Sequence, residues 1–356
     1  MVASKLLSGK SSPRRLVTRV GALALFLVVT LLSSCTQQIN AQRKSSSLVK
    51  GYEVSMDALM RDLIELTSAP HPFGSPRQHA LSLWLKKRAK EQGLDSTRIP
   101  FSSKTPNPAL MDKPGSPANL YVTKQGFNVI GKMSGSKDCQ VIIGSHYDTK
   151  DIKKGKNVGA NDSASSSAGL FQLVNLLSKM KIKSSLCDIL FVWFDGEESV
   201  LSDWYDGERK HPGKIQDNTY GSRHFASKLQ KCKGRFCLPE SSKPIVAFIL
   251  LDMIGSKNLK ITNELNSDNL LRKKFKEAAV RLGFDSIISK QAQKIEDDHI
   301  PFKKLGIPVL NVIDFENIYT WHTAGDTVDT ISPKSIEKVI KVVALVVDDL
   351  SNQFSK

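Results

Sequence analysis

Five short, continuous runs of apolar residues constrain the fold of this 356-residue chain more than any other feature. They are rich in Val, Ile and Phe and do not alternate with polar residues, which is typical of strands covered on both faces. The runs span residues 127–132, 140–145, 189–194, 245–251 and 308–313. Segments with helical periodicity lie between and around them, at residues 52–66, 77–92, 163–180, 222–229 and 269–282, with a last helix after Ser332. This order predicts an α/β fold, a three-layer sandwich in which helices flank a central mixed, mostly parallel sheet.

The composition is that of a folded protein with one large core. Hydrophobic residues make up 40% of the chain and charged residues 24%, which excludes a disordered chain, a collagen and a small disulfide scaffold. Neither a repeat nor an internal linker interrupts residues 48–356. We therefore expect these residues to form a single domain.

The first 35 residues have the layout of an export signal. Basic residues from Lys5 to Arg19 precede an apolar run from Val20 to Leu32, which ends at Ser33-Ser34-Cys35. This layout resembles a bacterial lipoprotein signal, in which the cysteine is lipidated and becomes the first mature residue. The alternatives are an uncleaved anchor helix or an ordinary signal with a chance cysteine. We expect residues 1–34 to be a signal peptide and residues 35–47 a polar tether, in a lipoprotein of the cell envelope that reaches the membrane through lipidated Cys35.

The formal net charge of +16 gives the chain a basic surface. Such a surface can bind nucleic acid or anionic lipid. Because an exported protein does not meet nucleic acid, we expect a solvated, lysine-rich surface and no nucleic-acid partner.

Four further cysteines suggest two disulfides. Cys139 and Cys187 each precede the polar end of an apolar run by seven or eight residues, so they lie level if the two runs are neighbouring parallel strands. Cys232 and Cys237 flank a short Lys-Gly-Arg-Phe loop. Because export permits disulfides, we predict Cys139–Cys187 and Cys232–Cys237. No pair of these cysteines stands at zinc-finger spacing from histidines, so a structural zinc is not indicated.

Polar residues follow four of the predicted strands at the same relative position. They are His146 and Asp148, then Asp195, Glu197 and Glu198, then Asp252, and last Asp314. In an open α/β sheet the ligand crevice lies beyond the carboxyl ends of the strands, so these side chains should converge. With Asp162 and His322 they form a nitrogen and oxygen ligand set suited to catalytic zinc. Each has a simpler alternative: Asp162 as a helix cap, the Glu pair as a solvated turn, and His146 as a hydrogen-bonded core histidine.

The order of these segments resembles the zinc aminopeptidase superfamily over residues 52–350. The matching segments are His-x-Asp at 146–148, Gly-Ala-x-Asp at 159–162, Asp-Gly-Glu-Glu at 195–198, Leu-Asp-Met-Ile-Gly at 251–255 and Trp-His-Thr at 321–323. In the aminopeptidases of that superfamily two zinc ions share a bridging Asp, which the resemblance places at Asp162. One zinc would add Glu198 and His322, the other would add His146 and Asp252, and the first Glu of the pair would activate a metal-bound water.

Other segments resemble the animal-type glutaminyl-peptide cyclotransferases, also called glutaminyl cyclases. They are Tyr-Gly-Ser-Arg-His at 220–224 and Asp-Asp-His-Ile-Pro-Phe at 297–302, together with His-Tyr-Asp at 146–148, Phe-Asp-Gly-Glu-Glu at 194–198 and the pair Trp-His at 321–322. The Asp-Asp-His string is the most specific, because it does not hold metal in the peptidases. This resemblance implies an acyltransferase that converts the N-terminal glutamine of peptides or proteins to pyroglutamate and releases ammonia.

The same resemblance implies a single Zn²⁺ as cofactor. Its ligands would be Asp162, Glu198 and His322, with the fourth position open for the γ-carbonyl oxygen of the substrate. His146 and Asp252 would be present without holding a second metal.

The resemblance also implies the roles of five side chains. Glu197 would accept the proton of the attacking amine and pass it to the departing nitrogen. Asp252 and Asp297 would belong to the proton network, and Trp204 and Trp321 would form the walls of the glutamine pocket. The simpler alternatives are a surface aromatic for Trp204 and the start of a turn for Asp297.

The chain departs from the animal enzymes at several positions. Ser145 and Ser167 or its neighbours replace two cysteines, Asn311 stands where a histidine is expected, and the loop over residues 204–219 is longer. No ligand is lost by these changes. The chain is thus predicted to be a monomeric, lipid-anchored cyclase of peptides and proteins with N-terminal glutamine. A two-zinc aminopeptidase is the first alternative, and a catalytically silent binding lipoprotein is the second.

Overall fold

The computed structural model describes residues 40, 42–109, 120–183, 185–204, 217–230 and 243–354. The predicted signal segment, residues 35–39 and 41 of the tether, the Cys232–Cys237 pair and residues 205–216 of the long loop lie outside the described residues. The chain divides into two units, Met1–Ser47 and Leu48–Lys356. In the first unit residues 42–47 are helical, and the second unit contains the sheet and the helices described below.

A six-stranded sheet forms the centre of the second unit, with its strands in the order β1-β2-β4-β3-β5-β8. These strands are β1 (Asp95–Pro106), β2 (Tyr121–Met133), β3 (Gln140–His146), β4 (Asp188–Phe194), β5 (Ile245–Asp252) and β8 (Val309–Ile313). The pairings β4–β3, β3–β5 and β5–β8 are parallel, whereas β1–β2 and β2–β4 are antiparallel. The predicted mixed, mostly parallel sheet is confirmed. A separate two-stranded sheet pairs β6 (Ile261–Glu264) with β7 (Ile288–Gln293).

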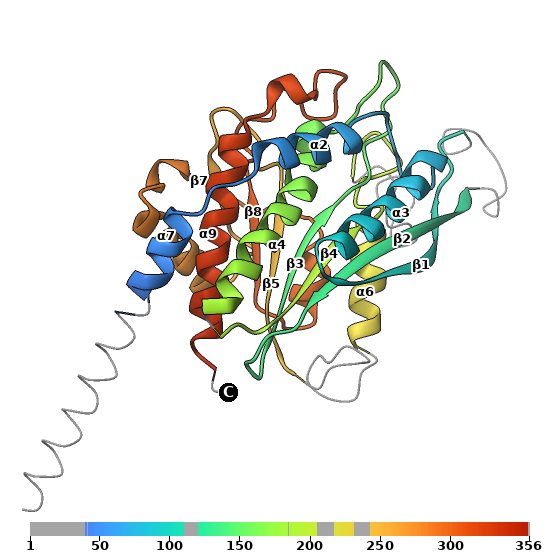
Figure 1. Ribbon diagram of the computed structural model, residues 1–356. Coiled ribbons are helices and arrows are strands. Elements are labelled where there is room, and N and C mark those ends of the chain that lie inside the picture. The colour runs from blue at the N-terminus through green and yellow to red at the C-terminus, as the bar shows by residue number, and fades with distance from the viewer. Residues whose placement is uncertain are drawn as a thin grey trace, which may run out of the picture. The chain divides into compact units, whose positions relative to one another are not determined.

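Helices cover both faces of the large sheet (Figure 1). They are α2 (Met56–Leu66), α3 (Pro76–Glu91), α4 (Ser166–Lys183), α6 (Tyr220–Gln230), α7 (Asn269–Leu282), α8 (Ile300–Lys304) and α9 (Pro333–Ser351), with short elements η2 (Ala160–Ser165), η3 (Asp285–Ile287) and η4 (Val328–Thr330). One face packs against α2, α3, α4, α7 and α9, and the other against α6 and α8. The three predicted layers are therefore present. Within the described part of the chain, no helix combines the length and the apolar character needed to cross a membrane.

The alternation of side chains along the central strands decides which helices they contact. In β4, Phe191 and Trp193 belong to the core shared with α4 and α9, whereas Val192 and Phe194 belong to the core that contains Phe302 of α8. All residues of β4 are buried. A strand with helices on both faces is apolar along most of its length, which explains the continuous apolar run at residues 189–194.

Local capping signals set the ends of α7 and the beginning of α9. The Asp268 carboxylate accepts hydrogen bonds from the first amides of α7, and Gly283 ends the helix with a left-handed φ of 77°. The observed bounds, Asn269–Leu282, are those predicted from the sequence. At α9 the Ser332 side chain accepts from the Ser335 amide, and Pro333 occupies the first turn.

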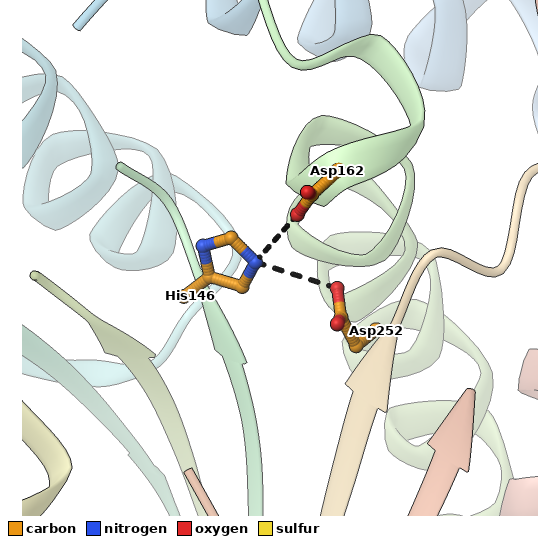
Figure 2. A group of neighbouring side chains, drawn as sticks. All are labelled: His146, Asp162 and Asp252. Atoms are coloured by element: carbon orange, nitrogen blue, oxygen red, sulfur yellow. Dashed lines mark ion pairs between the residues drawn. The ribbon is translucent and has the colours of Figure 1, made fainter. Parts of the chain in front are cut away.

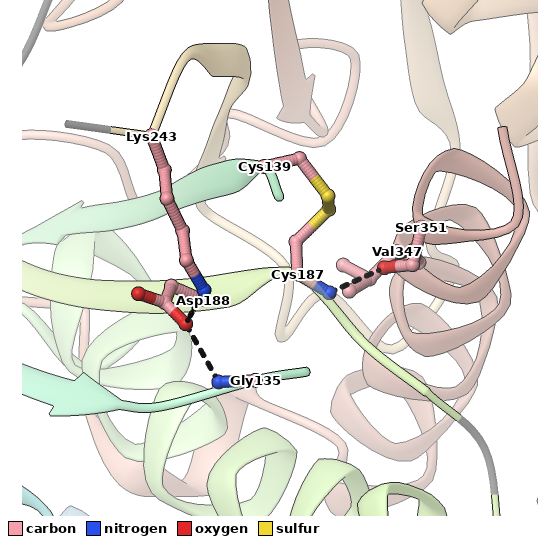
Figure 3. Close-up of a disulfide and its surroundings, with 7 residues drawn as sticks. All are labelled: Gly135, Cys139, Cys187, Asp188, Lys243, Val347 and Ser351. Atoms are coloured by element: carbon pink, nitrogen blue, oxygen red, sulfur yellow. Dashed lines mark hydrogen bonds and ion pairs between the residues drawn. A yellow bond between two sulfur atoms is a disulfide. The ribbon is translucent and has the colours of Figure 1, made fainter. Parts of the chain in front are cut away.

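The predicted disulfide between Cys139 and Cys187 is present (Figure 3). Gln140 pairs with Asp188 in the parallel β3–β4 ladder, so the cysteines just before them lie level. The Cys187 amide also donates a hydrogen bond of 3.0 Å to Ser351 Oγ, near the end of α9. The disulfide therefore joins the amino ends of two central strands, whose opposite ends carry the candidate site.

Candidate metal centre

The candidate ligands lie at the carboxyl ends of the parallel strands. His146 is the last residue of β3, Glu198 follows β4, and Asp252 is the last residue of β5. Asp162 lies in η2, and His322 lies in the segment after β8. Because parallel strands end at the same edge of a sheet, segments far apart in sequence bring these side chains together.

Two groups of candidate ligands share Asp162. In the first, His146 Nε2 lies 2.9 Å from Asp162 Oδ1 and 3.3 Å from Asp252 Oδ1 (Figure 2). In the second, His322 Nε2 lies 3.5 Å from Asp162 Oδ2 and 3.0 Å from Glu198 Oε2. In each group the possible ligand atoms lie within 4.8 Å of one another, so either group could hold a metal ion.

The hydrogen bonding of these groups fits a metal ion. His146 Nε2, Glu198 Oε2 and Asp252 Oδ1 are buried, and none has a hydrogen-bond partner among the described residues outside the two groups. Buried polar atoms without partners are costly, and a cation between them would satisfy their lone pairs. Two imidazoles and three carboxylates are also a donor set that zinc takes in proteins.

Two further carboxylates hold the backbone of the candidate ligands. Asp148 accepts hydrogen bonds from the amides of Glu197 and Glu198, at 2.9 and 3.2 Å. Asp326 accepts from the amides of Asn161 and Asp162, at 2.8 and 3.1 Å. Asp326, four residues after His322, was not singled out in the sequence, although it follows the Trp-His-Thr segment closely.

Two glycines of the sequence motifs have conformations that other residues rarely adopt. Gly159, before Asp162, has a φ of 61°, and a Cβ there would lie 2.3 Å from the Asp162 carbonyl oxygen. Gly196, between Asp195 and Glu197, has a φ of 70°, and its Cβ would meet the Phe73 ring at 2.9 Å. Both turns therefore require glycine next to a candidate site residue.

The charges of the group shift its pKa values strongly. Burial lowers the pKa of His322, but the carboxylates of Glu198 and Asp162 outweigh this effect and raise it to about 10. Burial raises the pKa of Asp162, but hydrogen bonds and charges from His146 and His322 hold it well below its usual value. A metal ion that binds these atoms must displace protons from the imidazoles, so metal affinity should fall as the pH falls.

A cavity of about 420 Å³ opens at this group. It is lined by all of the site residues predicted from the sequence: Asp162, Glu197, Glu198, Trp204, Asp252, Asp297, Trp321 and His322. The Trp321 ring stacks on His322, with ring centroids 3.9 Å apart, and Phe315 contacts its edge. Met253, Ile295 and Phe315 add an apolar wall that the sequence motifs did not indicate.

Glu197 lines this cavity beside the candidate ligand Glu198 and belongs to neither ligand group. Its side chain is buried, and burial together with the charge of Asp297 raises its pKa well above the usual value, against the lowering effect of His146. A buried carboxylate whose pKa is raised is a stronger base than a solvated one, which suits it to accept a proton.

Asp297 is held by Asn311, the residue found where a histidine was expected. Asn311 Nδ2 donates a hydrogen bond of 2.8 Å to Asp297 Oδ2, and the Asp298 amide donates to Asp297 Oδ1. Burial and the charge of Asp252 raise the pKa of Asp297 to about 7. Asn311 thus supplies a buried hydrogen-bond donor to the Asp297 carboxylate at the position where a histidine was expected.

Three acidic residues at the predicted strand ends do not line the cavity. Asp195 accepts a hydrogen bond from the Phe127 amide, Asp314 accepts from the Lys260 amide, and Asp148 holds the backbone described above. These carboxylates support the ends of the strands and loops around the cavity.

Comparison with known proteins assigns the family. The sequence model of peptidase family M28 matches residues 128–347. The chain belongs to peptidase family M28. This M28 chain is 31% identical over 234 residues to a glutaminyl-peptide cyclotransferase of Dictyostelium discoideum, a match that covers 61% of the chain and 62% of the relative. The chain therefore spans less than two thirds of the length of that relative.

Solved structures of the same fold are also similar to this M28 chain. A glutaminyl cyclase from an Acidobacteriales bacterium has a TM-score of 0.68 at 28% identity, over 85% of this chain and 98% of that one. A leucine aminopeptidase precursor from Bacteroides thetaiotaomicron has a TM-score of 0.66 at 19% identity, over 84% and 98% of the two chains. The second likeness concerns the fold alone.

Proposed function

We propose that the chain is a zinc-dependent glutaminyl-peptide cyclotransferase that acts on peptides or proteins with N-terminal glutamine. The observation that carries the proposal is the position of Asp297. The Asp-Asp-His segment supplies no residue to either ligand group, yet it places a buried carboxylate in the same cavity as Glu197 and the candidate ligands. The similarity to proteins named as glutaminyl cyclases supports the same activity.

The proposed metal is a single Zn²⁺ held by Asp162, Glu198 and His322. Their ligand atoms lie together at one wall of the cavity, and Asp148 and Asp326 fix the backbone of Glu198 and Asp162. When bound there, zinc would act as a Lewis acid that polarises the γ-carbonyl group of the glutamine.

The protein residues would then position the substrate and move its proton. The α-amino group of the substrate attacks its own γ-carbonyl carbon, a carbon–nitrogen bond forms, and the γ-amide nitrogen leaves as ammonia. Glu197 would take the proton from the attacking amine and return it to the departing nitrogen. Asp252 and Asp297 would accept hydrogen bonds from the nitrogen groups, and Trp204 and Trp321 would hold the side chain folded for ring closure.

A two-zinc aminopeptidase is the second candidate. The specific observation in its favour is the first ligand group, because His146, Asp162 and Asp252 could hold another ion. In that enzyme Glu197 would activate water, and the first residue of the peptide would be released. The two functions therefore differ in the number of metal ions and in the nucleophile.

The place of action proposed for this enzyme is the cell envelope. The support is the charged, apolar and small-residue order of residues 1–35, which favours a lipid anchor at Cys35. The proposed partners are accordingly exported peptides or proteins and a membrane, and the proposed state is a monomer.

Graded addition of zinc to the metal-free protein tests the proposal. Turnover of a glutamine-initiated peptide should reach its maximum at one equivalent of zinc, and a second equivalent should add nothing. A requirement for two equivalents, with release of free amino acid, would establish the aminopeptidase instead.

A further inference from the structure

The short segment Ser199–Leu201 connects candidate ligand Glu198 to the loop that carries Trp204. Buried Lys150 holds its carbonyl groups: Lys150 Nζ donates to the carbonyl oxygens of Ser199 and Leu201, both at 2.6 Å. It also donates to the hydroxyl group of Ser199. One ammonium group thus satisfies three oxygens of this segment.

The amides of the same segment are held by a buried carboxylate. Asp217 Oδ1 accepts a hydrogen bond of 2.7 Å from the Val200 amide, and Oδ2 accepts one of 2.8 Å from the Leu201 amide. The Tyr220 hydroxyl donates to Oδ1 as well, at 2.8 Å. Lys150 and Asp217 are 3% and 2% exposed, so both charges are removed from water.

The contacts of Lys150 lie next to those of Asp148 along the same segment. Asp148 holds the amides of Glu197 and Glu198, and Lys150, two residues later, holds the next carbonyl groups of the same strand-end segment. The segment after β3 therefore holds the segment after β4 at Glu197, Glu198, Ser199 and Leu201.

Burial of a charged side chain costs free energy, which hydrogen bonds only partly offset. Two buried charges on one short segment therefore indicate that the position of this segment matters to the site. We infer that Lys150 and Asp217 are positioning residues, which clamp Ser199–Leu201 from both sides and so aim Glu198 at the metal and Trp204 at the substrate. The part that concerns Trp204 rests on the proposed cyclase function, whereas the part that concerns Glu198 requires only a metal at the second ligand group.

Zinc affinity measured by competition with a chelator tests the inference without a reaction. Lys150→Met removes the ammonium group and keeps most of the apolar stem. We expect zinc affinity to fall about 10- to 100-fold, the usual effect of removing a residue that orients a metal ligand. KM for a glutamine-initiated peptide should rise as well, because Trp204 loses its fixed position. The control is Lys154→Met, an exposed lysine on the same loop, which should change neither quantity.

A second variant, Asp217→Asn, tests the same inference if Lys150→Met does not fold. Asp217→Asn retains one acceptor and loses the charge, so it should weaken zinc binding less than Lys150→Met. In the double variant neither charge is left alone in the interior, so the loss of affinity should be smaller than the product of the two single losses.

The inference is overturned if folded Lys150→Met or Asp217→Asn shows only a lower Tm, with zinc affinity and KM as in the wild type. A wild-type protein that binds zinc without cyclising the peptide would refute the proposed function. In that case the zinc affinities of the variants would still decide whether the clamp positions Glu198.

Discussion

Replacement of Glu197 by Gln removes the proposed proton acceptor and leaves every atom of the two ligand groups in place. The side chain is 5% exposed and lines the cavity, and Gln has nearly the same size. The backbone hydrogen bond of 2.9 Å to Asp148 does not involve the side chain and is retained. A positioned acid–base group contributes about 10²- to 10⁴-fold in rate, which corresponds to about 3–5 kcal/mol of transition-state free energy.

Ammonia release from a glutamine-initiated peptide at saturating zinc measures this effect. We expect kcat of Glu197→Gln to fall by about 10²- to 10⁴-fold, while zinc content by mass spectrometry stays that of the wild type. The matched control is Glu198→Gln, the same substitution one residue later, which should lower zinc affinity as well as kcat. A Glu197→Gln protein with wild-type kcat, or one that loses its zinc, would refute the assignment of Glu197 as the proton acceptor.

Three further predictions follow from other parts of the structure. Asp162→Ala and His322→Ala should each reduce the zinc retained after dialysis to well below that of the wild type, and unchanged zinc content would show that the metal lies elsewhere. Loss of the Cys139–Cys187 disulfide, which closes a separation of 48 residues, should lower the free energy of unfolding in urea by about 4 kcal/mol from chain entropy. Burial raises the pKa of the Glu264 carboxyl group, but His299 and the Asn266 amide outweigh this effect and lower the pKa to about 2. The ionised carboxylate therefore stabilises the folded protein above pH 4.5. The gap in unfolding free energy between wild type and Glu264→Gln should reach about 3 kcal/mol near neutral pH and close as the pH falls from 4.5 to 2, and a constant gap would contradict this account.

The central part of the fold was predictable because burial on both faces leaves a strong sequence pattern. The runs that became β3, β4, β5 and β8 contain almost no polar residue, and Ser332 marked the beginning of α9. β1 was not predicted: its sequence, Asp95–Pro106, is largely polar and contains two prolines, as an edge strand can. β6, β7 and α8 were missed because they are short and contain no continuous apolar run like that of β8.

The candidate site was predictable as a set of residues but not as a geometry. Motif order identified the eight side chains that line the cavity, whereas it also pointed to Asp195 and Asp314, which hold backbone amides instead. The contact of Lys150 with Leu201 joins residues 51 positions apart. Such contacts depend on the parallel pairing of strands and leave no periodic signal in the sequence.

The central claim is that the substrate's own amine, and not water, is the nucleophile. The direct measurement is incubation of the zinc-loaded protein with a glutamine-initiated peptide, with the peptide mass and free ammonia followed in the same sample. We predict one ammonia released per peptide converted, with every residue of the peptide retained. Release of free glutamine and a peptide shortened by one residue would contradict the claim and identify an aminopeptidase.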